Sequence, residues 1–433
     1  MKSDDDGMRR ETMRNGRRLI LKSGLAAAGG LAAAGMGRQA RAADIVPSAP
    51  PADNPWSDRI GAGVTVPPYG KPSKFEAGVI RRNVPWLTAN TQTSVTMAPL
   101  QSQNGIITPN GLFFVRDHAG SVMDIDPAQH RLMIHGLVDR PLLFDVEDIK
   151  RFPSVARIHF IECPANGATE WGGAQLNSVQ FTHGMASCAE WTGVPLRVLF
   201  EQTGLKANAK WILAEGADGA HMTRSVPLEK ALDDCLVVYA QNGEMLRPEQ
   251  GYPLRLLVPG WQGNVQVKWL RRLKVGDEPW YTREETSKYT ELMGDGKARA
   301  FTWQIFAKSV ITSPAPENPL TKGPGKYEVR GLAWSGAGRV SHVDISYDGG
   351  ISWVRARLQD PVLPKCFTRF TAEWAWDGKP ALIQSRAVDE SGYVQPTIAE
   401  LRKLRGVNPV YNNNSIQTWQ VKPDGSVFNV QLA

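Results

Sequence analysis

A single cysteine, Cys163, lies in the stretch of this sequence whose residue types are best suited to chemistry. The run 156–161 predicts a strand, and Pro164 and Gly167 follow the cysteine closely enough to end it. Binding and catalytic groups concentrate in loops at strand ends, and a thiolate there is a good ligand for a soft metal. The alternative is a buried structural thiol, because free cysteines are among the most buried residues. Cys163 taken alone leaves both interpretations open.

Three further cysteines bear on that choice. They are Cys188, Cys235 and Cys366, so the chain holds four in all. An even number permits two disulfides in an oxidising compartment, but a chain of this length can fold without them. A disulfide at Cys163 would exclude a metal-binding role for its sulfur.

The segments around Cys163 must position its side chain, and their sequence pattern predicts a mixed α+β domain over residues 76–300. Strands are expected at 131–134, 141–144, 210–214, 235–240, 254–258 and 265–275, and helices at 146–151 and 195–203. Pro195 in the first turn and Gly204 after the last turn delimit the second helix.

A second domain is predicted over residues 305–425. Short alternating strands follow one another from Tyr327 onward, with a turn at 348–350 and no helical period. This pattern predicts an antiparallel, Ig-like β-sandwich, and the fold class of the whole chain is α+β. Prolines at 314, 316 and 319 predict a rigid joint between the two domains.

The N-terminus predicts export rather than fold. The pair Arg17-Arg18, the apolar run 25–34 and the small-residue site 40–42 follow in the order of a twin-arginine signal peptide, residues 1–42. The apolar run is too short to span a bilayer. We therefore expect a periplasmic protein without a membrane span, in which residues 43–75 form an extended lead segment.

The signal peptide explains most of the net charge. The chain carries +7, and residues 1–42 contain nine Lys or Arg against four Asp or Glu, which is +5 and leaves about +2. The sequence pI of about 9.2 therefore does not indicate nucleic-acid binding.

Several motifs in order carry a family resemblance. They are FFVRDH at 113–118, ECPANG at 162–167, GMASCAEWTGVPL at 184–196, GYPLRLLVPG at 251–260, VKWLRRL at 267–273, YDGGISW at 347–353 and SRAVDESGYVQP at 385–396. Together, across residues 75–425, they resemble the sulfite oxidase family of molybdopterin enzymes. Within that family the sequence looks most similar to members that oxidise sulfane sulfur in bacterial thiosulfate oxidation.

The resemblance implies a molybdenum-molybdopterin cofactor that supports two-electron oxygen-atom transfer. The residues it implies are Cys163 as metal ligand, Asn166, His118, Arg255 and Lys268 as cofactor contacts, and Arg116 and Tyr289 on the substrate side. A soft thiolate suits such a sulfur-rich metal, and guanidinium groups suit phosphate. The alternatives are a solvated surface charge for each cation and a core aromatic for Tyr289.

Two departures from the family pattern bear on the substrate. Ala168 stands where sulfite-oxidising members carry an arginine, and Phe181 stands where they tend to carry a tryptophan. We expect these changes to weaken capture of free sulfite and to open the pocket. The expected substrate is therefore a sulfane sulfur on the cysteine of a carrier protein. The alternatives are a sulfite dehydrogenase, a reductase of oxidised methionine in proteins, and a non-catalytic scaffold.

The expected partners follow from a missing motif and from the second domain. The chain has no CxxCH haem-attachment motif. The resemblance therefore implies that electrons leave to a c-type cytochrome, as a subunit or a separate partner. It also implies that the C-terminal domain pairs two copies of the chain, in a homodimer or a heterotetramer with the cytochrome.

Overall fold

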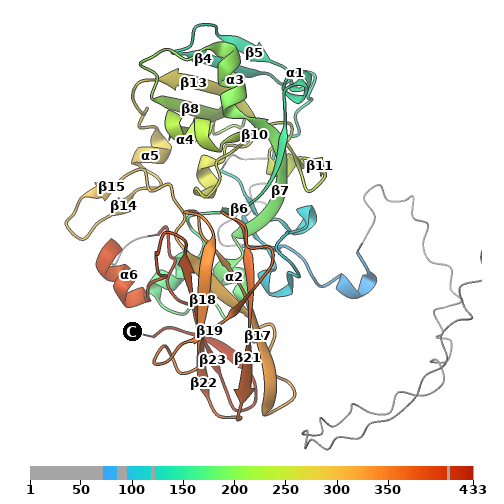
Figure 1. Ribbon diagram of the computed structural model, residues 1–433, viewed down its shortest axis with the longest axis vertical. Coiled ribbons are helices and arrows are strands. Elements are labelled where there is room, and N and C mark those ends of the chain that lie inside the picture. The colour runs from blue at the N-terminus through green and yellow to red at the C-terminus, as the bar shows by residue number, and fades with distance from the viewer. Residues whose placement is uncertain (1–71, 85–94, 119–121, 407–409, 433) are drawn as a thin grey trace, which may run out of the picture. The chain divides into compact units, whose positions relative to one another are not determined.

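The computed structural model describes residues 72–84, 95–118, 122–406 and 410–432. They belong to one compact unit that begins at Pro72 (Figure 1). The predicted signal peptide and all but the last four residues of the predicted lead segment lie outside the described residues. Within the described ranges, no helix is both long enough and apolar enough to cross a membrane.

Helices are short and strands dominate, which confirms the mixed α+β class. The α-helices are α1 (Val146–Arg151), α2 (Val179–His183), α3 (Leu196–Thr203), α4 (Leu228–Asp233), α5 (Arg283–Thr286) and α6 (Ile398–Arg405). Short 3-10 turns are η1 (Lys74–Glu76), η3 (Leu100–Ser102), η4 (Asn110–Leu112), η5 (Ala168–Gly172), η6 (Pro248–Gln250) and η7 (Gly263–Val265). Helix α3 begins after Pro195 and ends at Thr203, and Gly204 follows it with a φ of 68° that few other residues adopt readily.

The sheet that carries Cys163 is antiparallel. Its strands are β6 (Val155–Glu162), β7 (Ala186–Pro195), β10 (Leu236–Gln241), β11 (Glu244–Met245) and β12 (Arg255–Leu257). Strand β6 is exposed at its start and fully buried over its last three residues. The chain therefore delivers Cys163 into the interior at the point where pairing with β7 ends.

A second sheet of the same region is mixed. Its order is β5 (Leu142–Phe144), β4 (Leu132–Gly136), β13 (Leu270–Gly276), β8 (Trp211–Gly216) and β9 (Thr223–Pro227). Strands β4 and β13 run parallel, and the other pairs are antiparallel. The predicted strand 265–275 was wrong over its first five residues: 263–265 form η7, and the ladder begins only at Leu270.

Two smaller sheets complete this part of the chain. One contains β1 (Arg82–Asn83), β2 (Val95–Met97) and β3 (Val115–Arg116), and the other contains β14 (Glu291–Leu292) and β15 (Ala298–Arg299). Strand β3 fixes the backbone of Arg116, one of the predicted site residues, beside that of Val95.

The C-terminal part contains two antiparallel sheets that pack against each other (Figure 1). One has the order β16 (Lys308–Ser313), β17 (Gly325–Trp334), β21 (Thr368–Trp376), β20 (Arg357–Gln359). The other has the order β19 (Val354–Arg355), β18 (Val340–Ser346), β22 (Ala381–Asp389), β23 (Thr418–Val421), β24 (Val427–Val430). An Ig-like topology stays a prediction.

Two expectations for this part were wrong. The segment after β22 contains a helix, α6, which begins at a capping box formed by Thr397 and Glu400. The proline-rich stretch 314–319 is not a joint between domains, because it connects the paired strands β16 and β17 within one sheet. Short length hid the helix, since eight residues span only about two turns.

The hydrophobic core runs without interruption from β6 and β7 into the C-terminal sheets. The Phe160 ring stacks on Phe367 with centroids 6.3 Å apart and contacts Trp334 at 6.5 Å. All three side chains are at most 1% exposed. The strand before Cys163 is therefore packed directly against the part of the chain that follows residue 305.

Candidate cofactor site

Cys163 lies at the first position after β6, as predicted. Its backbone N–H donates to the Met185 carbonyl at 3.0 Å, and its own carbonyl accepts from the Asn166 N–H at 2.9 Å. The chain then turns at Gly167, whose φ is 84°. The thiol is free and the residue is 6% exposed, and this burial raises the pKa of the thiol. A cation or metal beside the sulfur would be needed to keep a thiolate there.

A cavity opens beside Cys163. Five of the seven predicted site residues line it, namely Arg116, His118, Cys163, Arg255 and Lys268. They come from β3, the loop after β3, the end of β6, β12 and the loop before β13. Motifs that are far apart in the sequence therefore meet at one concave site, which we call the Cys163 cavity.

Buried cations dominate the wall of the cavity. Arg255 is 4% exposed, and its Nη1 donates to the carbonyl and the side-chain oxygen of Gln250, at 3.1 Å each. The Arg255 guanidinium also lies 5.3 Å from the centroid of the Trp191 ring. Burial lowers the pKa of Arg255 to about 9, which Asp117 partly opposes.

Lys268 is the second buried cation. Its ammonium forms an ion pair with Asp117 and donates to the Glu249 carbonyl at 2.9 Å. Burial lowers the pKa of Lys268, while Asp117 raises it. Two carboxylates, Asp117 and Asp218, are thus set against the three cations Arg116, Arg255 and Lys268 on the cavity wall, which leaves it net positive.

Tyr289 contacts His118, which is one of the residues on the cavity wall. The Tyr289 hydroxyl is hydrogen-bonded to Nε2 of His118, and the two rings meet edge-on with centroids 6.0 Å apart. His118 reaches solvent on one side; burial of the rest of the ring and the charges of Arg116 and Lys268 lower its pKa to about 3. Burial raises the pKa of Tyr289 well above its usual value. Both groups are therefore neutral near pH 7.

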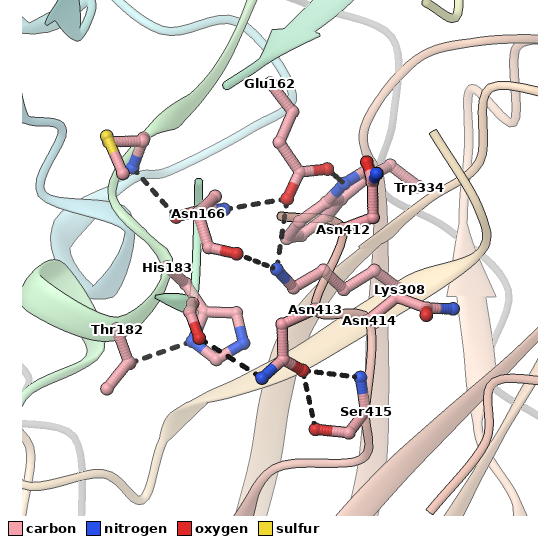
Figure 2. A network of polar contacts seen from close by, with 12 residues as sticks. Glu162, Asn166, Thr182, His183, Lys308, Trp334, Asn412, Asn413, Asn414 and Ser415 are labelled. Atoms are coloured by element: carbon pink, nitrogen blue, oxygen red, sulfur yellow. Dashed lines mark hydrogen bonds and ion pairs between the residues drawn. The ribbon is translucent and has the colours of Figure 1, made fainter. Parts of the chain in front are cut away.

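Asn166 is not on the wall of the Cys163 cavity. Its side chain lies behind the cysteine, where Nδ2 donates to Glu162 at 2.8 Å and Oδ1 accepts from the Met185 N–H at 3.1 Å. Figure 2 shows Asn166 within a polar network that includes Glu162 and Lys308. In this structure Asn166 therefore has an internal role, because it holds the loop that carries Cys163. Its contact with the cofactor stays a prediction.

The two departures from the family pattern also lie off the cavity wall. Ala168 begins η5, and Phe181 is half-buried on α2, packed against the hydrophobic core. Neither is among the residues that line the cavity. The expectation that Phe181 opens this pocket is therefore not supported by its position.

The residues of the cavity fit a phosphorylated pterin. Among the described residues, Nε of Arg255 and Oδ2 of Asp117 are buried and have no hydrogen-bond partner. Such groups are costly unless a bound molecule satisfies them. A phosphate suits the guanidinium, and ring N–H groups suit the carboxylate. The sulfur at the same wall adds a soft metal ligand.

Sequence reasoning missed several residues of this site. Asp117, Asp218, Gln250, Asn264, Gln266 and Trp269 also line the cavity. Asp117 stands inside the quoted motif FFVRDH, so a charge-pairing argument could have found it. Gln250 and Asn264 lie in 3-10 turns without a distinctive local pattern, and only the fold brings them to the cysteine.

Comparison with known families agrees with this geometry. Residues 119–283 match the oxidoreductase molybdopterin-binding domain, and residues 299–419 match the Mo-co oxidoreductase dimerisation domain. The first match covers Cys163, Arg255 and Lys268. It begins directly after His118.

Curated relatives are similar over most of the chain. Rat mitochondrial sulfite oxidase is 31% identical over 338 residues, covering 70% of this chain and 59% of that protein. Chicken sulfite oxidase is 30% identical over 356 residues, covering 75% of this chain and 76% of that protein. Tomato NADH nitrate reductase is 32% identical over 307 residues, or 63% of this chain. This chain spans 59% of the rat enzyme's length and 33% of the tomato enzyme's length.

A solved structure is more similar still. The sulfane dehydrogenase SoxCD from Paracoccus pantotrophus is 51% identical, with a TM-score of 0.86 over 88% of this chain and 98% of that chain. The two domain matches, the chicken enzyme and this structure agree with the cavity built around Cys163. The chain belongs to the sulfite oxidase family of molybdopterin oxidoreductases, and its cofactor is molybdenum-molybdopterin.

Proposed function

We propose that this protein is the molybdenum subunit of an exported sulfane dehydrogenase. Its substrate is the sulfane sulfur held on the cysteine of a carrier protein during thiosulfate oxidation. The observation that carries the proposal is the meeting of Cys163 with Arg116, Arg255 and Lys268 on one cavity. The 51% identity to a sulfane dehydrogenase supports this substrate class over others in the family.

The buried residues of the cavity hold the cofactor. Cys163 is the protein ligand to the metal, Arg255 binds the pterin phosphate, and Lys268 with Asp117 contacts the polar ring. When bound, the cofactor supplies two-electron oxygen-atom transfer, in which each oxygen comes from water with release of two protons and two electrons. The walls around Cys163 keep that position dry, since the residue is only 6% exposed.

Arg116 and Tyr289 act on the substrate side. Arg116 is partly exposed at the cavity, where its guanidinium can hold an anionic sulfur group. Tyr289 and His118 are both neutral near pH 7, so they orient the substrate by hydrogen bonding and add no charge. Of the two neighbours Arg116 and His118, only Arg116 therefore brings positive charge to the substrate.

Electrons leave this chain to a c-type cytochrome. The solved sulfane dehydrogenase named above is a complex, which supports a partner subunit. The C-terminal match to a dimerisation domain supports a homodimer, or a heterotetramer when the cytochrome is included. Export to the periplasm by the twin-arginine route is part of the proposal and rests on residues 1–42.

A sulfite dehydrogenase is the second candidate. The sulfite oxidases of rat and chicken, at 31% and 30% identity, favour it. The cation Arg116 suits sulfite as well as a larger sulfur anion. The two candidates differ in what must reach the cavity: a free ion in one case, and a side chain on another protein in the other.

A steady-state assay with both substrates separates the candidates. The purified enzyme would be given free sulfite and, separately, a carrier protein loaded with sulfane sulfur, with cytochrome c reduction as the readout. The same carrier with its cysteine alkylated is the matched control. We expect turnover of the loaded carrier and poor turnover of sulfite. Efficient oxidation of sulfite with no activity on the carrier would establish the second candidate instead.

A further inference from the structure

A buried lysine from the C-terminal sheets reaches the loop that carries Cys163. Lys308, the first residue of β16, is 2% exposed. Its ammonium donates to Glu162 Oε1 at 3.1 Å and to the Asn166 carbonyl at 3.0 Å (Figure 2). Lys308 therefore holds the residues on both sides of Cys163. That segment lies more than 140 positions before Lys308 in the sequence.

The carboxylate of Glu162 is the centre of this contact. Besides Lys308, it accepts from Asn166 Nδ2 at 2.8 Å on Oε1 and from Trp334 Nε1 at 2.6 Å on Oε2 (Figure 2). Glu162 is 3% exposed and Trp334 is fully buried. Both carboxylate oxygens are satisfied, so the buried charge is paired and its side chain is fixed.

A second segment of the C-terminal part holds the rest of the loop. The Asn412 N–H donates to the Pro164 carbonyl at 2.7 Å, and Asn413 Nδ2 donates to the Gly167 carbonyl at 3.2 Å. With Lys308 on Asn166, the carbonyls of three residues in the loop 163–167 accept from residues that follow position 305. We call Glu162, Lys308, Trp334, Asn412 and Asn413 the loop clamp.

We propose that Lys308 is a positioning residue for Cys163, and that the C-terminal domain thereby helps to set the geometry of the metal ligand as well as pairing subunits. The loop clamp acts through the carboxylate of Glu162 and the backbone carbonyls of the loop 163–167, and it does not line the Cys163 cavity. Partners of this kind orient a ligand side chain, and their loss typically costs 10- to 100-fold in metal affinity or activity. The inference rests on the proposed role of Cys163 as the metal ligand.

The buried ion pair between Lys308 and Glu162 would not by itself indicate a positioning role. Such pairs contribute little net stability, because desolvation offsets the attraction between the charges. What distinguishes Lys308 is its second acceptor, the Asn166 carbonyl, which lies inside the loop. Lys365 provides the comparison: it pairs with Asp234 at 2.6 Å and also joins the C-terminal part to the rest of the chain, but it contacts no residue of the loop 163–167.

The test compares Lys308→Met with the matched control Lys365→Met in the full-length holoenzyme. Hydrogen exchange of the peptide 160–172 reports the loop, while molybdenum content and the electron paramagnetic resonance spectrum report the metal. We expect Lys308→Met to lower molybdenum affinity by about tenfold, so that the purified variant holds less of the metal. It should also speed hydrogen exchange of this peptide and shift the spectrum. Lys365→Met should leave all three as in the wild type, and Lys308→Arg should restore them in part.

The proposal is overturned if Lys308→Met shows wild-type exchange in peptide 160–172 and a wild-type spectrum. If Lys308→Met fails to fold, Asn413→Ala decides by the same readouts, because it removes one contact to the loop and no charge. The exchange measurement separates this inference from the proposed function. A wild-type protein that binds no molybdenum would refute the function, whereas an unchanged loop in the variants would refute the clamp.

Discussion

The Tyr289 hydroxyl is hydrogen-bonded to Nε2 of His118, and this contact joins two segments that lie 171 positions apart in the sequence. Tyr289 is itself held by its neighbours. Its ring lies 5.1 Å from that of Tyr411 and 5.4 Å from the guanidinium of Arg224. The residue is 6% exposed and is not among the residues that line the Cys163 cavity, so its packed ring reaches the cavity wall only through the hydrogen bond to His118.

Tyr289→Phe should therefore lower kcat/KM by about tenfold, the effect of one hydrogen bond of roughly 1.4 kcal/mol. The ring and its packing remain, so the free energy of unfolding should change by less than about 1 kcal/mol. Tyr347→Phe is the matched control, because its hydroxyl donates to the Glu373 carbonyl at 3.1 Å in the C-terminal sheets. Equal losses of activity in both variants would remove Tyr289 from the substrate side.

Arg116→Gln tests the cation on the substrate side. Loss of a charged hydrogen bond of about 1.5–3 kcal/mol should raise KM between ten- and a hundredfold, with a smaller effect on kcat. The control is Arg271→Gln, which removes a cation of β13 that pairs with Glu215 on β8, and Arg271 does not line the cavity. An unchanged KM in the Arg116 variant would show that the substrate does not contact this guanidinium.

Acid should destabilise the protein through His183. This residue is 2% exposed, and burial, with Lys308 nearby, holds the pKa of its imidazole well below the usual value. The unfolded chain takes up a proton near pH 6.5 and the folded chain does not. The contribution of His183 to the free energy of unfolding is thus complete above about pH 6.5. It is lost as the pH falls towards the pKa that the imidazole has in the folded chain.

His183→Asn should accordingly flatten the pH dependence of unfolding. Denaturant titrations at pH 7, 6 and 5 should show a slope smaller by up to about 1.4 kcal/mol per pH unit than in the wild type. The change removes an aromatic ring from the core, so the variant is expected to be less stable at pH 7. An identical slope in both proteins would contradict this account of the buried imidazole.

Much of the site could be predicted because its residues stand in short motifs. The strand that ends before Cys163 follows from the apolar run and the breakers after it, and the observed β6 ends at Glu162. Arg116, His118, Arg255 and Lys268 come from three separate motifs, yet the structure places them on one cavity. The family resemblance of the motifs identified these residues, because each cation taken alone would be read as a solvated surface charge. Each motif sits at a strand end or in a loop beside one.

The rest depended on contacts between distant segments. Nothing around Lys308 marks it as a partner of Glu162, since the two lie 146 positions apart and meet only when the core between them forms. The family resemblance implied a cofactor contact for Asn166, but its side chain donates to Glu162 on the far side of the loop. Spacing predicts proximity to Cys163 and does not predict on which side of the loop a side chain lies.

The remaining cysteines provide a control for the role of Cys163. Cys188 and Cys235 are free and buried, and neither lines the Cys163 cavity. Cys188→Ser and Cys235→Ser should therefore keep most of the activity and all of the molybdenum, with a modest loss of stability from a buried hydroxyl. Loss of the metal in Cys235→Ser would show that metal binding depends on more than the loop at Cys163.

X-ray absorption at the molybdenum edge tests the central claim most directly. The wild-type protein and Cys163→Ser would be purified with the cofactor, and the sulfur atoms around the metal would be counted. We expect one sulfur fewer in Cys163→Ser, together with loss of activity on the loaded carrier. The same number of sulfur neighbours in both proteins would contradict the assignment of Cys163 as the ligand.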